Sequence, residues 1–164
     1  MAKRLIVMRH AKSSWGENGQ SDHARPLSKR GRRDAPAVAR RLVEFDWAPN
    51  LVLSSDAVRT RETYALMSPE LTEVDRVEYL SAFYNDGYPA LLAMLREVPD
   101  VFGTVLALGH NPGWEEAVYW LSGESIEMTT ANCALLECDT DGWDATIEHR
   151  EKWRLCDVIR PRAL

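Results

Sequence analysis

The chain has 164 residues, which is enough to bury the core of one domain and too few for two comfortable ones. Apolar residues make up 45% and charged residues 27%, as is ordinary for a globular protein in water. The net charge of -5 disfavours an obligate nucleic-acid binder, whose affinity depends on neutralising phosphates. We therefore expect one domain, residues 1–164, without a nucleic-acid partner.

Cysteine usage and hydrophobic runs indicate where the protein works. Cys133, Cys138 and Cys156 form no C-x-x-C pair, and an odd number does not suggest a disulfide framework. We interpret them as reduced, mostly buried small hydrophobic residues. The apolar run Leu5–Met8 is too short for a signal-peptide core, and no stretch approaches the length of a membrane span. We expect a cytoplasmic protein with no membrane partner.

The first half of the chain alternates strand and helix patterns. Leu5–Met8 is apolar without alternation, which predicts a strand buried on both faces. Ser28 can cap a helix whose apolar residues recur at helical spacing from Ala35 to Val43. Leu51–Leu53 follows a Pro-Asn break and predicts a second buried strand. Ser54–Asp56, with Ser55 as the N-cap, would then open a helix that runs to about residue 69.

The second half continues the alternation and then changes character. Val74–Leu80 predicts a third strand, Pro89 opens a helix, and Thr104–Leu108 predicts a further buried strand. A Gly-His-Asn-Pro-Gly turn then leads into a helix over Trp114–Leu121. Near the end, apolar segments at 133–138 and 145–153 flank an Asp-Gly pair, which is a strong hairpin pattern.

Strands that alternate with helices and end in a hairpin define a fold class. The order predicts an α/β protein: a three-layer α/β/α sandwich with a mostly parallel central sheet and an antiparallel edge or hairpin.

Two of the four histidines follow directly after predicted parallel strands. Arg9 and His10 follow the first strand, and His110 follows the strand that begins at Thr104. In an open parallel sheet, ligands bind at the carboxyl ends of the strands. Arg59 lies in the first turn of the helix after the second strand, so its side chain points back toward those ends. Arg61 is about 200° further around the helix and faces elsewhere.

Two arginines and two histidines around one cavity suit a phosphoryl group. Guanidinium groups match phosphate oxygens bidentately, and a neutral imidazole is a competent phosphoryl acceptor. Arginine side chains can neutralise the negative charge on the equatorial oxygens, a role that Mg²⁺ has in many phosphoryl-transfer enzymes. The pattern predicts that His10 accepts the phosphoryl group, that Arg9 and Arg59 bind it, and that His110 donates a hydrogen bond to it. No cofactor or metal is then required.

Other polar residues near these segments are weaker candidates. Lys12 and Ser13 follow His10 directly and would lie at the rim of the pocket as substrate-binding residues. Arg25 could contact the anion, or it could pair with Asp22 or a neighbouring carboxylate. His149 lies on the predicted terminal hairpin, where a structural role is the better interpretation.

A cluster of basic residues also needs an interpretation. Lys29, Arg30, Arg32 and Arg33 fall in the first turns of a predicted helix, opposite its apolar stripe. A solvated helix face is the simplest account. The cluster could also help to attract an acidic partner protein by long-range steering.

Four segments, in this order, resemble the histidine phosphatase superfamily and specifically the small SixA-like phosphohistidine phosphatases. They are Val7–Trp15, Arg25–Gly31, Ser54–Thr63 and Gly109–Gly113. The resemblance implies a phosphoglycerate-mutase-like fold, His10 as the nucleophile, and a phosphate pocket formed by Arg9, Arg59 and His110. It also implies catalysis without a metal.

The chain departs from the larger members of that superfamily at two places. Ala11 stands where the mutase branch has a glycine, as in SixA-like proteins. Aligning on Phe83-Tyr84 puts Ser81 where those enzymes carry a glutamate general acid, with Glu78 about one turn away. Whether Glu78 acts as an acid stays open.

The missing acid bears on the substrate. An alkoxide leaving group needs a proton, and help of this kind is worth about 10²–10⁴-fold in rate. The imidazole of phosphohistidine leaves more easily. We therefore expect the enzyme to act on phosphohistidine of a partner protein. The alternatives are a phosphatase for small phosphate esters that uses the same site, and a non-catalytic phosphate-binding module.

Overall fold

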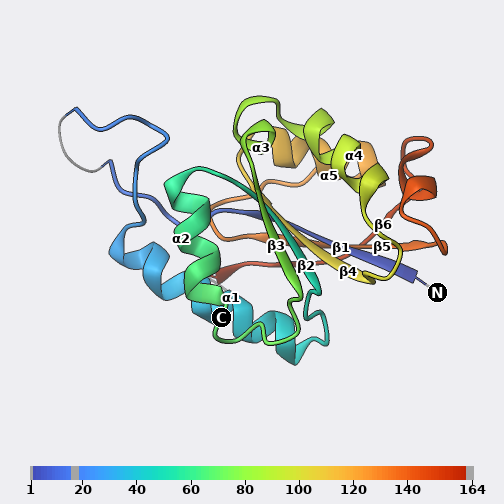
Figure 1. Ribbon diagram of the computed structural model, residues 1–164, viewed down its shortest axis with the longest axis horizontal. Helices are drawn as coiled ribbons and strands as arrows, with labels where there is room; N and C mark the ends of the chain where they lie inside the picture. The colour runs from blue at the N-terminus through green and yellow to red at the C-terminus, as the bar shows by residue number, and fades with distance from the viewer. Residues whose placement is uncertain (1, 16–18, 162–164) are drawn as a thin grey trace.

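Helices cover both faces of a six-stranded sheet (Figure 1). The structure, a computed structural model, describes residues 2–15 and 19–161. The strands are β1 (Ala2–Arg9), β2 (Leu51–Ser55), β3 (Arg76–Leu80), β4 (Thr104–Gly109), β5 (Cys133–Asp139) and β6 (Arg154–Ile159). The helices are α1 (Lys29–Glu44), α2 (Val58–Met67), α3 (Ser81–Asn85), α4 (Tyr88–Glu97), α5 (Gly113–Ser122) and the 3-10 helix η1 (Asp144–Ile147).

The strand order is β3-β2-β4-β1-β5-β6. The first four of these strands are parallel, β5 runs antiparallel to β1, and β6 runs antiparallel to β5. The expected mostly parallel sheet with an antiparallel edge is confirmed. Because β2, β4 and β1 are neighbours, their carboxyl ends meet at one edge of the sheet, where open α/β sheets bind ligands.

Alternate residues of β1 serve two separate cores. Ile6 and Met8 pack with α1 and α2, whereas Leu5 and Val7 pack with α3, α4 and α5. All four side chains are fully buried, which explains why this strand shows no polar alternation. The strand that precedes His10 is therefore held from both sides.

The start of α1 presses against the segment that follows β1. Ser28 caps the helix by accepting a hydrogen bond from the Gly31 amide, and its own amide donates to the Lys12 carbonyl at 2.8 Å. A Cβ atom on Gly31 would overlap the backbone of Lys12. Glycine is needed here because two backbones approach closely.

We expect Gly31→Ala to lower the free energy of unfolding by about 1–3 kcal/mol, because the added methyl group forces two backbone segments apart. Urea unfolding measures this change. Gly103→Ala is the matched control, since a Cβ there meets its nearest atom at 3.9 Å. Equal stability of the two variants would contradict the account.

The predicted strand at 145–153 is wrong. The chain forms η1 there, and the last strand is β6, which pairs with β5. Two tryptophans explain the longer connection: Trp143 and Trp153 are buried, with ring centroids 5.9 Å apart. Their indole nitrogens donate to the carbonyls of Phe102 and Thr146. The segment between β5 and β6 thus packs its two tryptophans into the hydrophobic core and does not form a tight turn.

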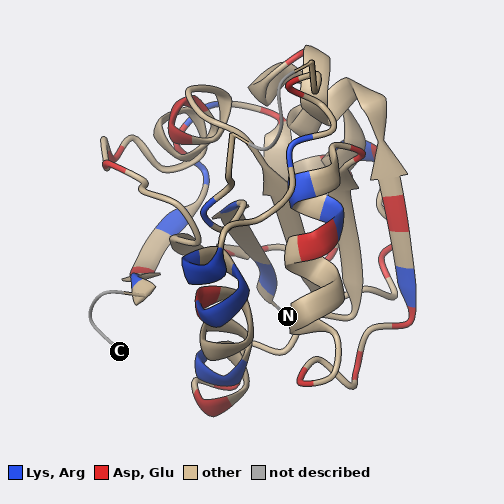
Figure 2. Ribbon diagram, turned by 90° about the vertical axis from the view of Figure 1, so that its left-hand side faces the viewer, with Lys and Arg blue, Asp and Glu red and all other residues tan. Residues whose placement is uncertain are grey.

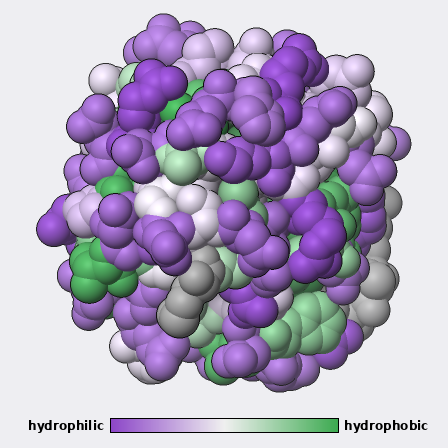
Figure 3. Space-filling model, turned by 90° about the vertical axis from the view of Figure 1, so that its right-hand side faces the viewer, coloured by the Kyte–Doolittle hydropathy of each residue, from purple (hydrophilic) through white to green (hydrophobic). Residues whose placement is uncertain are grey.

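Two smaller features complete the fold. Cys133 and Cys138 are buried, as expected, but Cys156 is exposed on the edge strand β6. Within the described part of the chain, no helix is both long and apolar enough to cross a membrane. At the end of the molecule seen in Figure 3, hydrophilic side chains cover most of the surface and hydrophobic ones form separate patches.

Candidate active site

A cavity of about 300 Å³ lies at the carboxyl ends of β1, β2 and β4. Every residue that the sequence marks as catalytic or substrate-binding lines it. The complete lining is Arg9, His10, Lys12, Ser13, Trp15, Arg25, Arg59, His110, Asn111 and Thr130. Four of these residues are arginine or lysine, so the cavity suits an anion.

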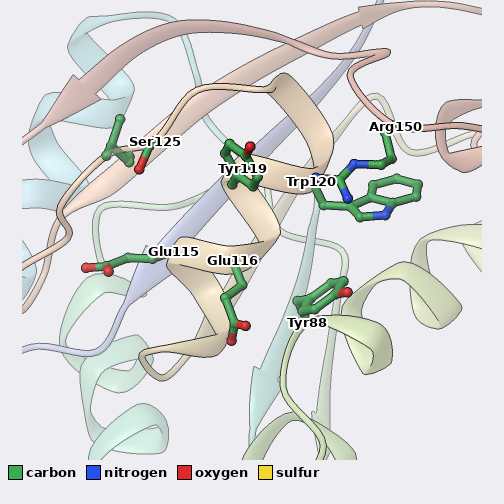
Figure 4. Close-up of a pocket in the computed structure, with 8 residues that line it drawn as sticks. Tyr88, Glu115, Glu116, Tyr119, Trp120, Ser125 and Arg150 are labelled. Atoms are coloured by element: carbon green, nitrogen blue, oxygen red, sulfur yellow. The ribbon is translucent and has the colours of Figure 1, made fainter.

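A second cavity, of about 380 Å³, lies along α5 (Figure 4). Its lining combines Tyr88, Tyr119 and Trp120 with the carboxylates of Glu115 and Glu116, and Arg150 is its cationic member. Two carboxylates repel a phosphate dianion. The smaller cavity is therefore the candidate active site.

His10 is 6% exposed. Its Nδ1 lies 2.7 Å from the Ala11 carbonyl, which accepts only, so Nδ1 carries the hydrogen and Nε2 carries a lone pair that accepts a long hydrogen bond from Arg59 Nε. Burial lowers the pKa of His10 to about 3, and the neighbouring charges of Arg59 and Arg9 act in the same direction. At neutral pH the ring therefore presents an unprotonated Nε2 to the cavity.

Arg59 lies in the first turn of α2, as predicted, and is 7% exposed. Its Nε donates to His10 Nε2 at 3.4 Å, so the guanidinium contacts the proposed nucleophilic nitrogen. Nη1 donates to the Asp22 carbonyl at 2.7 Å, and Nη2 donates to Asp22 Oδ2 at 3.1 Å. Asp22 thus occupies donors that a phosphate oxygen would need.

Three side chains hold the Asp22 carboxylate. The Tyr84 hydroxyl donates to Oδ2 at 2.7 Å, Arg25 Nη1 donates to Oδ1 at 2.9 Å, and Arg59 supplies the third contact. The Tyr84 hydrogen bond and these arginines hold the pKa of Asp22 well below its usual range. From the sequence we expected Asp22 only as a possible ion-pair partner of Arg25, and we did not predict a role for Tyr84 in the site. The two alternatives for Arg25 coincide, because it both lines the cavity and pairs with Asp22.

Ser55 is not the N-cap of α2, which begins at Val58 after Ala57. Ser55 instead ends β2 with its hydroxyl fully buried. Its Oγ accepts from the Ala57 amide at 3.2 Å and lies 2.8 Å from His110 Nε2. The strand continues to Ser55 because its side chain has these two partners inside the fold.

The Ser55 contact determines where His110 carries its hydrogen. Among the described residues, the Ser55 hydroxyl hydrogen has no acceptor other than His110 Nε2, so we assign the hydroxyl as the donor, which leaves the hydrogen of the neutral ring on Nδ1. Burial, and then the charge of Arg59, lowers the pKa of His110 to about 4. Nδ1 is buried with no partner among the described residues. His110 therefore holds an unused N–H donor beside His10, with ring centroids 5.3 Å apart.

Ser55→Ala is expected to lower kcat/KM by about tenfold, because the loss of one hydrogen bond releases the His110 ring from its tautomer. The readout is the pair of ¹⁵N chemical shifts of His110, which should move from an Nδ1–H to a mixed pattern. Ser54→Ala is the matched control, since Ser54 is equally buried but donates to the Ser55 carbonyl. An Nε2–H tautomer in the unmodified protein would refute this assignment.

Arg9 is anchored by the segment that leads into β5. Its Nη1 donates to the Met128 carbonyl at 3.1 Å. Glu115 Oε2 accepts from the Met128 amide at 2.7 Å and from Asn111 Nδ2 at 2.9 Å. Glu115 thus fixes the segment that fixes Arg9. The sequence did not mark Glu115, because nothing in its local pattern distinguishes it from a surface glutamate.

Neither candidate for the missing general acid lines the cavity. Glu78 lies on β3, with Oε2 4.0 Å from Arg76 Nη1, and Ser81 begins α3. The carboxylate in contact with the arginines of the cavity is Asp22. Across residues 2–15 and 19–161, no group of three His, Cys, Asp or Glu side chains is placed to hold a metal ion.

Comparison with known proteins agrees with this geometry. Residues 5–85 match the sequence model of the histidine phosphatase superfamily (branch 1). Over its length the chain is 39% identical to an uncharacterized chloroplastic protein of Arabidopsis thaliana, covering 98% of this chain and 79% of that protein. The chain belongs to the histidine phosphatase superfamily.

Solved structures place this histidine phosphatase among SixA-like members. A structure assigned as the phosphohistidine phosphatase SixA of Nakamurella multipartita has a TM-score of 0.86 and 27% identity, covering 98% of this chain and 97% of that chain. A corresponding assignment from Agrobacterium tumefaciens has a TM-score of 0.82 and 26% identity, covering 97% and 98%. The fold is thus phosphoglycerate-mutase-like, and the likeness supports phosphatase activity.

Proposed function

We propose that this histidine phosphatase removes the phosphoryl group from phosphohistidine on a partner protein, through a phosphohistidine intermediate on His10 and without a metal. The observation that supports the proposal most directly is the neutral, buried His10, whose Nε2 faces the cavity beside Arg59. A pure phosphate-binding module needs the arginines but has no use for a nucleophile held in this state.

In the first step, the lone pair on His10 Nε2 attacks phosphorus. A P–N bond to His10 forms as the P–N bond of the substrate breaks, and the substrate imidazole, protonated by solvent at its other ring nitrogen, leaves as a neutral ring. Arg9, Arg59 and the His110 Nδ1–H stabilise the charge on the equatorial oxygens. The phosphate oxygens take the place of the Asp22 carboxylate at Arg59.

In the second step, water attacks phosphorus of the intermediate. A P–O bond forms, the bond to Nε2 breaks, and the water loses a proton to solvent. His10 keeps the hydrogen on Nδ1 throughout because the Ala11 carbonyl accepts it. The ring therefore departs in its neutral form, which makes it a good leaving group.

Among the described residues, the lining of the cavity includes no carboxylic acid suited to an alkoxide leaving group. The low pKa of Asp22 keeps it ionised, so it is a poor proton donor at neutral pH. This supports a P–N substrate over a phosphate ester.

Hydrolysis of phosphohistidine and phosphoserine peptides, compared side by side with a chelator present, tests the proposal. We expect turnover of phosphohistidine at a kcat/KM at least about 10²-fold higher, the size of the missing acid's contribution. Faster hydrolysis of a sugar phosphate than of the phosphohistidine peptide would refute the proposed substrate class. Tight phosphate binding with no turnover of any substrate would identify a binding module instead.

A further inference from the structure

The mouth of the active-site cavity carries an exposed tryptophan. Trp15 is 78% exposed although it lines the cavity, and the guanidinium of Arg25 stacks over its ring at 3.8 Å. Arg25 is itself fixed, because it donates to Ser13 Oγ at 2.7 Å and to Asp22 Oδ1. An aromatic ring held in place and left exposed is typical of an anchor for a protein partner.

Lys12 lines the same cavity as Trp15, and α1 begins next to Lys12 with further basic residues. Lys12 is exposed at the rim of the cavity, and the first turn of α1 lies against its backbone through Ser28 and Gly31. Lys29 and Arg33 are exposed on that helix. Figure 2 shows lysine and arginine gathered in the first turns of α1 and α2 at this end of the molecule.

Within the described residues, no carboxylate is ion-paired with Lys12, Lys29 or Arg33, whereas Arg32, on the same helix, lies 3.7 Å from Glu62. The chain as a whole carries 25 acidic and 20 basic residues, so this positive region runs against the overall charge. Such a region attracts negative partners and speeds their association.

Lys29 and Arg33 lie outside the lining of the cavity. A ligand that only fills the 300 Å³ cavity has no reason to contact them. A phosphorylated residue on a protein surface does, because the surface around it extends over the mouth. A substrate that contacts these two residues must therefore extend beyond the cavity, as a protein does.

We propose that Trp15, Lys12, Lys29 and Arg33, called here the mouth surface, dock the acidic surface that surrounds the phosphohistidine of the partner protein. This inference rests on the proposed function and names its substrate more closely. Trp15 supplies apolar contact, and the three cations supply orientation and a faster encounter, which are the usual effects of charge at the rim of an interface.

The test uses three phosphohistidine peptides whose flanks are rich in Glu and Asp, neutral, or rich in Lys, together with free phosphohistidine. The intact protein should prefer the acidic peptide, and the preference should weaken as salt screens the charges. The double variant Lys29→Glu, Arg33→Glu should lose about tenfold or more in kcat/KM on the acidic peptide at low salt. Its turnover of free phosphohistidine should stay within about twofold, because neither residue reaches the cavity.

A matched control carries the same change of charge elsewhere. Arg96→Glu, Arg150→Glu replaces two exposed arginines on the α4 and α5 side of the sheet, and it should keep the preference for the acidic peptide. Trp15→Ala should raise KM for that peptide more than it lowers kcat.

Three outcomes would overturn the proposal. Equal kcat/KM on all three peptides would show that the enzyme does not recognise the charge of the residues that flank the phosphohistidine. Equal losses in the two double variants would show a general charge effect and no docking surface. No turnover of free phosphohistidine or of any phosphohistidine peptide would refute the proposed function itself, and the substrate inferred here with it.

Discussion

Replacing His10 with alanine is expected to abolish turnover, lowering kcat/KM on phosphohistidine by on the order of 10⁴-fold or more. The substitution removes Nε2, the nitrogen that Arg59 approaches at 3.4 Å inside the cavity. Without it the two-step displacement has no acceptor, and the arginines can only bind phosphate. The variant should therefore still bind inorganic phosphate while it fails to turn over.

Intact-mass measurement after alkaline quenching detects the intermediate directly. The unmodified protein should gain one phosphoryl group during turnover, which acid then removes, and His10→Ala should not gain it. His149→Ala is the control: that ring is exposed on the connection between β5 and β6 and should leave both activity and intermediate unchanged. An acid-labile phosphoryl group on the His10→Ala protein would refute the assigned nucleophile.

Acidification from pH 7 to pH 5 is expected to lower the free energy of unfolding by about 2 kcal/mol through His10 alone. In the folded protein, burial lowers the pKa of His10 from 6.5 to about 3. Between these values the unfolded chain binds a proton that the folded chain does not. The contribution of His10 to the free energy of unfolding is therefore fully present above about pH 6.5, and it is lost as the pH falls toward about 3.

His110 adds to this loss in the same direction, since burial lowers its pKa to about 4. Asp22 contributes little above pH 5, because both its ordinary pKa of 3.8 and its lowered pKa in the folded protein lie below that range. Between pH 7 and pH 5, the loss of stability at this site therefore comes from its histidines and not from the Asp22 carboxylate.

Urea unfolding at several pH values between 7 and 5 measures the effect. A His10→Asn variant should show a shallower pH dependence, because only the His110 contribution remains at the site. His149→Ala should keep the slope of the unmodified protein. Equal slopes in the unmodified protein and His10→Asn would show that His10 does not titrate as its burial requires.

The sequence predicts the buried strands well because burial on both faces leaves a continuous apolar run. Leu5–Met8 and Thr104–Leu108 are of this kind, and both lie in the middle of the sheet. The final strand was misplaced because an Asp-Gly pair is a strong local turn pattern, whereas the path of residues 140–153 is set by where Trp143 and Trp153 find a core.

The site likewise has residues that the sequence predicts and residues that it does not. Residues that follow strands are predictable, because parallel strands bring their carboxyl ends to one edge, and His10, Arg59 and His110 all line the cavity there. The contact between Asp22 and Tyr84 joins residues 62 positions apart and depends on the route of the loop after β1. No periodicity in the chain encodes that route. The role of Ser55 was missed because a serine after a strand is more often a helix cap.

The interior position of β1 has a consequence for how the protein loses its activity. Leu5–Met8 pair on one side with β4 and on the other with β5, and none of these side chains is exposed. Their amides should exchange with deuterated water only when the whole molecule opens, at a free energy close to that of global unfolding. His10 directly follows this strand, so partial opening elsewhere should leave it in place. The described residues of the loop that carries Trp15 and Asp22 are held outside the sheet, by contacts such as those of Asp22 with Arg59 and Tyr84, so docking should fail under milder conditions than the nucleophile does.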